Sequence, residues 1–167
     1  MERGEEISPS IAKAIKASKL SVIIFSEKYA FSRWCLDEVA QILECKKVNG
    51  QIVMPVFYRV EPVHVRNQRG SFACAFAKHE EHLKERMEKV ENWRSALKEA
   101  GSICGWDSLV IRAESKLIEE IVGDISKKLN QTSPSHSTGL LGNVERSYHR
   151  NMGHGGHRQD HSCWSYI

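Results

Sequence analysis

No run of apolar residues in this sequence is long enough to cross a membrane, although 41% of its 167 residues are hydrophobic. Strong charge of one sign is also lacking, because 24 basic and 21 acidic residues leave a net charge of +3. No basic stripe is interleaved with aromatic residues, as nucleic-acid binding would require. We therefore expect neither nucleic acid nor a membrane among the partners.

Cysteine pairs of the C-x-x-C type are missing, and the five cysteines are an odd number. This pattern favours free thiols in a reducing compartment over a disulfide framework. The first six residues, Met1-Glu2-Arg3-Gly4-Glu5-Glu6, are too acidic and polar for a secretory signal peptide. Together these features indicate a protein of the cytoplasm or the nucleus. Its length suits one domain with some excess.

Apolar strands alternate with amphipathic helices over most of the chain. Buried strands are predicted over residues 20–25 and 52–58, and helices over 7–18, 32–48 and 114–129. A further helix is predicted from residue 70 to about 79, and it continues helically over 80–98. Residues 101–106 form either a short edge strand or a packed loop. The alternation predicts an α/β fold in which helices cover both faces of a parallel sheet.

Helix ends and inward faces follow from local signals. Ser8 and Ser32 are placed to cap helices, and Asn49-Gly50 is placed to end one. In the stretch over 80–98, the apolar spacing predicts that Val90, Trp93 and Leu97 face inward. The last helix is predicted because its apolar residues recur at helical spacing: Leu117, Ile118, Ile121, Ile125 and Leu129.

A candidate site lies where the first strand gives way to the helix that Ser32 begins. Trp34 and Glu38 are one helical turn apart and share a face of that helix. The face lies beyond the carboxyl end of the strand, where open α/β sheets form clefts. An alternative interpretation is an amphipathic helix with a core Trp34 and a solvated Glu38.

Several ordered motifs carry a family resemblance. They are Arg3-Gly4-Glu5-x-Ile7, Ser26-x-x-Tyr29-x-x-Ser32-x-Trp34-Cys35-Leu36-x-Glu38, Pro55-Val56-Phe57-Tyr58-x-Val60-x-Pro62, Val65-Arg66-x-Gln68-x-Gly70-x-Phe72, Trp93-Arg94-x-Ala96-Leu97 and Gly105-Trp106. The sequence resembles the TIR (Toll/interleukin-1 receptor) domains of plant TIR-NBS-LRR disease-resistance proteins. The resemblance implies a flavodoxin-like fold with a parallel sheet. Because the chain starts at the family's Arg-Gly loop, we expect the first strand, first helix and second strand to be missing.

The resemblance also implies an activity, the hydrolysis of NAD+ (NAD glycohydrolase or ADP-ribosyl cyclase type), with NAD as substrate and no cofactor. Glu38 stands at the position of the family's catalytic glutamate. Substrate-binding roles are expected for Arg3, Ser26 and Trp34, although an exposed Arg3, a Ser26 that merely ends the strand and a packed Trp34 are open alternatives. Asp37 is interpreted as a solvated residue of the helix face. The chain as given is expected to cleave NAD slowly or not at all.

Other TIR domains are the expected protein partners, through self-association that signals defence and cell death. Residues 114–129 correspond to a helix that contributes to an assembly surface in the family. The alternative function is a catalytically inactive TIR adaptor or decoy that acts by pairing with intact TIR domains.

Domain boundaries are expected at residues 1–130 for a partial TIR domain, 131–142 for a Ser/Thr-rich linker and 143–167 for a disordered tail. The tail holds His149, His154, His157, His161 and Cys163, but no apolar pattern would build a metal site around them, so no metal is expected. Back-translated and shifted by one nucleotide, its codons permit Gly-Met-Gly-Gly-Ile-Gly-Lys-Thr-Thr, a P-loop. We interpret the tail as the out-of-frame translation of a P-loop region.

Overall fold

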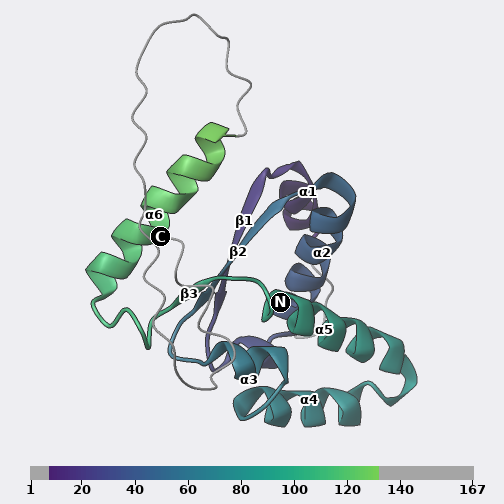
Figure 1. Cartoon of the computed structure of the whole chain (residues 1–167). Coiled ribbons are helices and arrows are strands. Elements are labelled where there is room, and N and C mark those ends of the chain that lie inside the picture. Colours follow the sequence, from purple (N-terminus) through teal and green to yellow (C-terminus); the bar gives the residue numbers. More distant parts are fainter. Residues whose placement is uncertain (1–7, 132–167) are drawn as a thin grey trace, which may run out of the picture.

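The computed structural model describes residues 8–131, and every structural statement below concerns that part of the chain. Three parallel strands form one sheet in the order β1-β2-β3 (Figure 1). The elements in chain order are α1 Pro9–Ala17, β1 Leu20–Phe25, η1 Tyr29–Phe31, α2 Arg33–Asn49, β2 Ile52–Phe57, α3 Pro62–Arg66, α4 Ser71–His82, η2 Lys84–Arg86, α5 Met87–Ala100, β3 Trp106–Asp107 and α6 Glu114–Gln131. The predicted parallel α/β architecture is confirmed.

The register of the sheet runs without a bulge from Leu20 opposite Ile52 to Phe25 opposite Phe57. β3 is only two residues long and pairs with the end of β2. The open choice at residues 101–106 is thus resolved as a loop over 101–105 followed by a short edge strand that begins at Trp106. Helices α1 to α5 lie on one side of the sheet and α6 lies on the other (Figure 1). Because the three strands are parallel, their carboxyl ends lie at the same edge of the sheet, next to the loops that follow them.

The two predicted caps are present. The Ser8 hydroxyl accepts from the amide of Ile11 at 3.3 Å, and the Ser32 hydroxyl accepts from the amide of Cys35 at 3.3 Å. Gly50 ends α2 with φ at +67°, a left-handed conformation that glycine adopts without the penalty of a Cβ. α1 has no buried residue, and its end is tied to β2 by the Gln51 amide, which donates to two backbone carbonyls of the α1 end, Ile15 and Ser18, at 2.8 Å each.

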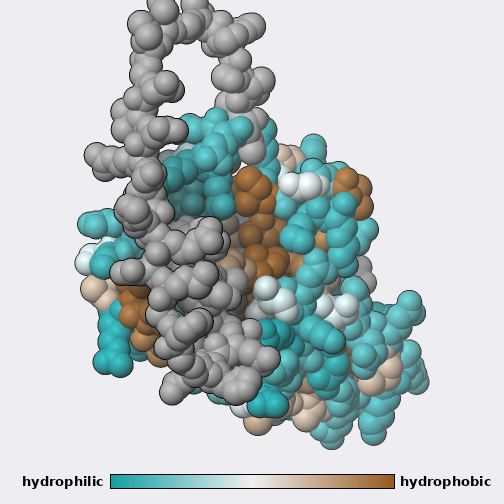
Figure 2. Space-filling model, viewed as in Figure 1, coloured by the Kyte–Doolittle hydropathy of each residue, from teal (hydrophilic) through white to brown (hydrophobic). Residues whose placement is uncertain are grey.

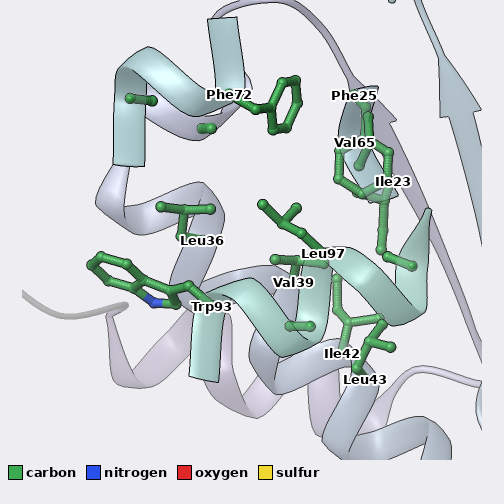
Figure 3. Packing of buried hydrophobic residues seen from close by; sticks show 14 of the residues in the cluster. Ile23, Phe25, Leu36, Val39, Ile42, Leu43, Val65, Phe72, Trp93 and Leu97 are labelled. Carbon is green, nitrogen blue, oxygen red and sulfur yellow. The ribbon is translucent and has the colours of Figure 1, made fainter. Parts of the chain in front are cut away.

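The larger core fills the space between the sheet and α2, α4 and α5. Figure 3 shows its side chains converging from these elements. Trp93 of α5 is fully buried, as are Phe25 of β1 and Phe72 of α4. Val90, Trp93 and Leu97 all face this core, so the predicted inward face of α5 is confirmed.

A smaller core lies on the opposite face, between β2, β3 and α6. Leu117 is buried there, and Ile121 and Ile125 pack against it. Ile118 is 60% exposed and Leu129 is 39% exposed, so not all of the apolar residues at helical spacing in α6 face this core. The apolar stripe of α6 is wider than the part of the three-stranded sheet on which the helix packs.

The structure differs from the expected helices in two places. The helical stretch over 70–98 is two α-helices, because the chain leaves α4 after His82 and passes through η2 before α5 begins. α3 was not predicted at all. Cys35, Cys45 and Cys74 are free thiols, as the sequence predicted. The linker from 132 onward and the tail over 143–167 lie outside the described residues.

Candidate functional site

Glu38 lies on α2, in the turn after the Ser32 cap, and is half-buried. The helix starts soon after the carboxyl end of β1, so Glu38 is placed at the edge of the sheet where clefts form. Burial raises the pKa of the Glu38 carboxyl above its usual range. A carboxylate that is partly removed from water interacts more strongly with a developing positive charge than one in bulk solvent.

Tyr29 packs beside Glu38 and holds the connecting loop against the helix. Its hydroxyl donates to the backbone carbonyl of Cys35 at 3.0 Å, and its ring meets Phe25 edge-on at 4.7 Å. Burial raises the pKa of Tyr29 strongly, and the nearby Cys35 and Glu38 groups raise it further. Tyr29 therefore stays protonated as a hydrogen-bond donor and fixes the distance between loop and helix.

The other site residues from the sequence lie in different surroundings. Ser26 directly follows β1, is half-buried, and its carbonyl accepts from the amide of Tyr29 at 3.0 Å, so it also ends the strand. Trp34 is 40% exposed on α2, one turn before Glu38, and the interpretation of a core tryptophan is wrong. Arg3 lies outside the described residues.

Asp37 is not the solvated residue that its position next to Glu38 suggested. Its carboxylate accepts from the indole N–H of Trp93 at 2.8 Å and pairs with the ammonium of Lys89 at 3.1 Å, and its side chain is 12% exposed. A buried indole N–H needs an acceptor, and α5 brings this one against α2. Asp37 therefore has a structural role, because it joins α2 to α5. Its neighbour Glu38 makes neither of these contacts.

Sequence reasoning also missed His79, which lies in α4 and is 6% exposed. Its Nε2 lies 2.7 Å from the carbonyl of Ala30, and since a carbonyl only accepts, the ring nitrogen donates. Ala30 is in η1, next to Tyr29, so α4 positions the loop that leads to Glu38. The imidazole ring of His79 also lies 5.3 Å from the ring of Trp93, measured between ring centres.

The pH dependence of stability should report on His79. Burial lowers the pKa of His79, and the charges of Arg33 and His82 add to this against the opposite effect of the Ala30 carbonyl. The unfolded chain therefore binds the proton more readily, and the free energy of unfolding should fall as the pH drops through about 6.5. His79→Gln should be less stable by about 1–3 kcal/mol at neutral pH and should lack this step.

Urea titrations of both proteins from about pH 7.5 to about pH 5.5 measure the difference. The other titrating groups contribute equally to the pH dependence of both proteins. The difference between their free energies of unfolding at each pH therefore reports on His79 alone. Parallel curves for the two proteins would contradict the assignment.

Among residues 8–131, no group of three or more His, Cys, Asp or Glu side chains is arranged to hold a metal ion. No helix in the same range has both the length and the apolar character to span a bilayer. What the site offers chemically is one half-buried carboxylate with an aromatic hydroxyl beside it and an exposed Trp34 one turn away.

The sequence profile described as TIR domain matches residues 1–142. The disease resistance protein RPV1 of Vitis rotundifolia is 51% identical over 129 residues, which cover 77% of this chain and 9% of that protein. The TMV resistance protein N of Nicotiana glutinosa is 42% identical over 142 residues, or 85% of this chain and 12% of that protein. The chain thus spans about a tenth of the length of these curated relatives.

A solved structure agrees with the fold. The TIR domains in the activated Roq1 resistosome, which directly recognizes the pathogen effector XopQ, match with a TM-score of 0.68 and 42% identity. The match covers 75% of this chain and 76% of that one. The parallel strands and their helices are those of the flavodoxin-like TIR fold. The chain belongs to the TIR domain family, and its relatives are plant disease-resistance proteins.

Proposed function

We propose that this TIR domain hydrolyses the bond between nicotinamide and ribose in NAD+, with Glu38 as the catalytic residue. Nicotinamide is a positively charged ring in NAD+ and leaves as a neutral molecule, so no proton donor is needed. The sugar carbon that it leaves develops positive charge, which one carboxylate stabilises. This differs from ordinary glycosidases, which need a second carboxyl group as acid.

The observation that carries the proposal is the placement of Glu38. Its carboxyl is half-buried at the carboxyl edge of the sheet, its pKa is raised by burial, and Tyr29 fixes the neighbouring loop. Partial desolvation strengthens its effect on an adjacent cation. In this proposal Ser26 hydrogen-bonds the ribose, the exposed ring of Trp34 forms a wall for the substrate, and Arg3 meets a phosphate.

The proposed setting is plant defence, in which TIR domains are brought together and cleave NAD in the assembled state. The relatives are disease-resistance proteins, and the Roq1 match is an activated assembly of such a protein. A second candidate function is an adaptor that acts by TIR–TIR association alone. The exposed apolar residues of α6, Ile118 and Val122, favour an association role.

Nicotinamide release tests the proposal. The full chain is assayed beside an extended protein in which the strand-helix-strand segment of a relative's TIR domain precedes residue 3. The extended protein should release nicotinamide, and for each nicotinamide it should form one molecule of ADP-ribose or of cyclic ADP-ribose. The chain itself should release nicotinamide more slowly. An NAD analogue whose ribose ring oxygen is replaced by methylene should not be cleaved, because it cannot share the positive charge with an oxygen.

Failure of the extended protein, folded and assembled, to release nicotinamide would support the adaptor function. Cleavage of the methylene analogue at a comparable rate would contradict the charge-stabilisation mechanism.

A further inference from the structure

A histidine of α4 holds the loop that precedes Glu38. The surface over α4 and α5 is mainly hydrophilic (Figure 2), and His79 contributes little to it, because only 6% of the residue is exposed. Its Nε2 donates to the carbonyl of Ala30 across 2.7 Å. Ala30 is the middle residue of η1 and is fully buried. A buried carbonyl that loses its donor is costly, so this hydrogen bond fixes where η1 lies.

Two aromatic rings keep the His79 side chain in one orientation. The ring centre of Phe76 lies 6.1 Å from that of the imidazole, and the ring centre of Trp93 lies 5.3 Å from it, both edge-on. Phe76 and Trp93 are fully buried and come from α4 and α5. A close-packed interior leaves the imidazole little freedom to turn. The core itself therefore directs the donor nitrogen of His79 at η1.

The second part of the connection runs from η1 to α2. Tyr29 precedes Ala30, and its hydroxyl donates to the carbonyl of Cys35 at 3.0 Å. Cys35 lies in the first turn of α2, and Glu38 follows it by three residues. Residues one helical turn apart keep a fixed spacing, so a shift of the first turn of α2 displaces Glu38 as well.

We infer that His79 is a positioning residue for Glu38. It holds Ala30, and η1 transmits this hold through Tyr29 to the first turn of α2. The proposed reaction gives His79 no step of its own, and its role is to keep the carboxylate in place. The effect on the rate rests on the proposed hydrolysis of NAD+, whereas the effect on the position of the carboxylate does not. A reacting group displaced by about 1 Å can slow a reaction about 10²-fold.

Titration of Glu38 reports on its position without any turnover. The full chain is labelled with ¹³C at the glutamate carboxyls, and Glu38→Gln identifies the resonance. In the unchanged chain the midpoint should lie above the usual range of a glutamate, because burial raises the pKa of this carboxyl. His79→Leu removes the donor and frees η1, so water reaches the carboxyl and the midpoint should fall toward the usual range. His79→Gln retains an amide N–H for Ala30 and should keep the midpoint raised.

Kinetics of the extended protein measure the effect on the reaction. His79→Leu should lower kcat about 10–100-fold, because the carboxylate no longer meets the ribose at the right place. KM should change by less than about threefold, since the residues proposed to bind the substrate are unchanged. His79→Gln should keep kcat within about threefold of the unchanged protein, which a loss of imidazole packing alone would not explain.

His82→Leu is the matched control. His82 is an exposed histidine of the same helix, and its Nδ1 lies 2.6 Å from the carbonyl of Lys78, which is not part of η1. The Glu38 midpoint and kcat should both stay unchanged in this variant. A circular dichroism melt checks that every variant is folded.

Tyr29→Phe tests the same connection from its other end. It keeps the aromatic ring and removes only the hydroxyl that joins η1 to α2. Both the midpoint and kcat should fall, as they do in His79→Leu. The double variant should be little worse than either single variant, because the two residues act in series.

Three results would overturn the inference. The first is a Glu38 midpoint that His79→Leu leaves unchanged. The second is a His79→Gln variant that behaves like His79→Leu. The third is additive effects of the Tyr29 and His79 substitutions. An extended protein that releases no nicotinamide, while the midpoints follow the expected pattern, contradicts the proposed function and still supports the role of His79 in placing Glu38.

Discussion

Glu38→Ala in the extended protein should lower the rate of nicotinamide release by about 10²–10³-fold or more, with little change in stability. The carboxylate is the group proposed to stabilise positive charge on the ribose, and alanine leaves nothing in its place. Glu38 is half-buried on the surface of α2 and fills no part of the core, so its removal opens no cavity. Chromatographic measurement of nicotinamide under single-turnover conditions reports the loss directly.

Glu44→Ala is the control for this experiment. Glu44 is an exposed carboxylate farther along the same helix, so its loss changes the charge of α2 by the same amount. This variant should retain activity within about twofold of the unchanged protein, as a surface substitution distant from the reaction does. Turnover by Glu38→Ala at a comparable rate would refute the assignment of the catalytic residue.

Asp37→Ala should destabilise the fold by about 2–4 kcal/mol, although it is adjacent in sequence to a residue whose loss is nearly neutral for stability. The change leaves the indole N–H of Trp93 without its acceptor in a fully buried position. It also removes the partner of Lys89 at the junction of α2 and α5. Urea unfolding followed by tryptophan fluorescence measures the effect.

A double-mutant cycle separates the hydrogen bond from the rest of this effect. Trp93→Phe keeps an aromatic ring in the core and removes the N–H, so the added cost of Asp37→Ala should be smaller in that background. The Lys89 side chain is 28% exposed, so its ammonium can reach water when Asp37 is removed, and this limits the share of the ion pair in the total cost. Equal costs of Asp37→Ala in the two backgrounds would show that the hydrogen bond contributes nothing.

The helices and strands could be predicted where their signals are local. The cap at Ser32 and the left-handed Gly50 define α2 from residues at or next to its ends, and the β1 run is apolar throughout. The break between α4 and α5 was missed because the residues around Leu83 are good helix formers and include neither proline nor glycine. That break comes from the packing of the two helices on the core.

The surroundings of the candidate site could not be predicted from the sequence, because they are formed by contacts between residues that lie far apart in the chain. Asp37 looked solvated because its partners, Trp93 and Lys89, are on a helix far along the chain. The donation from His79 to the carbonyl of Ala30 likewise joins two distant segments. The role of Glu38 stays a prediction, since it rests on the family motif and on the placement of the carboxyl.

The amide of Gln51 gives α1 a different standing from every other helix that contacts the larger core. α1 has no buried residue of its own, and it is held by the partly buried Ile15, which packs against the larger core, and by the Gln51 side chain, which holds the carbonyls of Ile15 and Ser18. Such a segment opens as a separate cooperative unit well below the free energy of global unfolding. We therefore expect limited proteolysis and amide exchange of the described residues to begin at α1, before the core helices open.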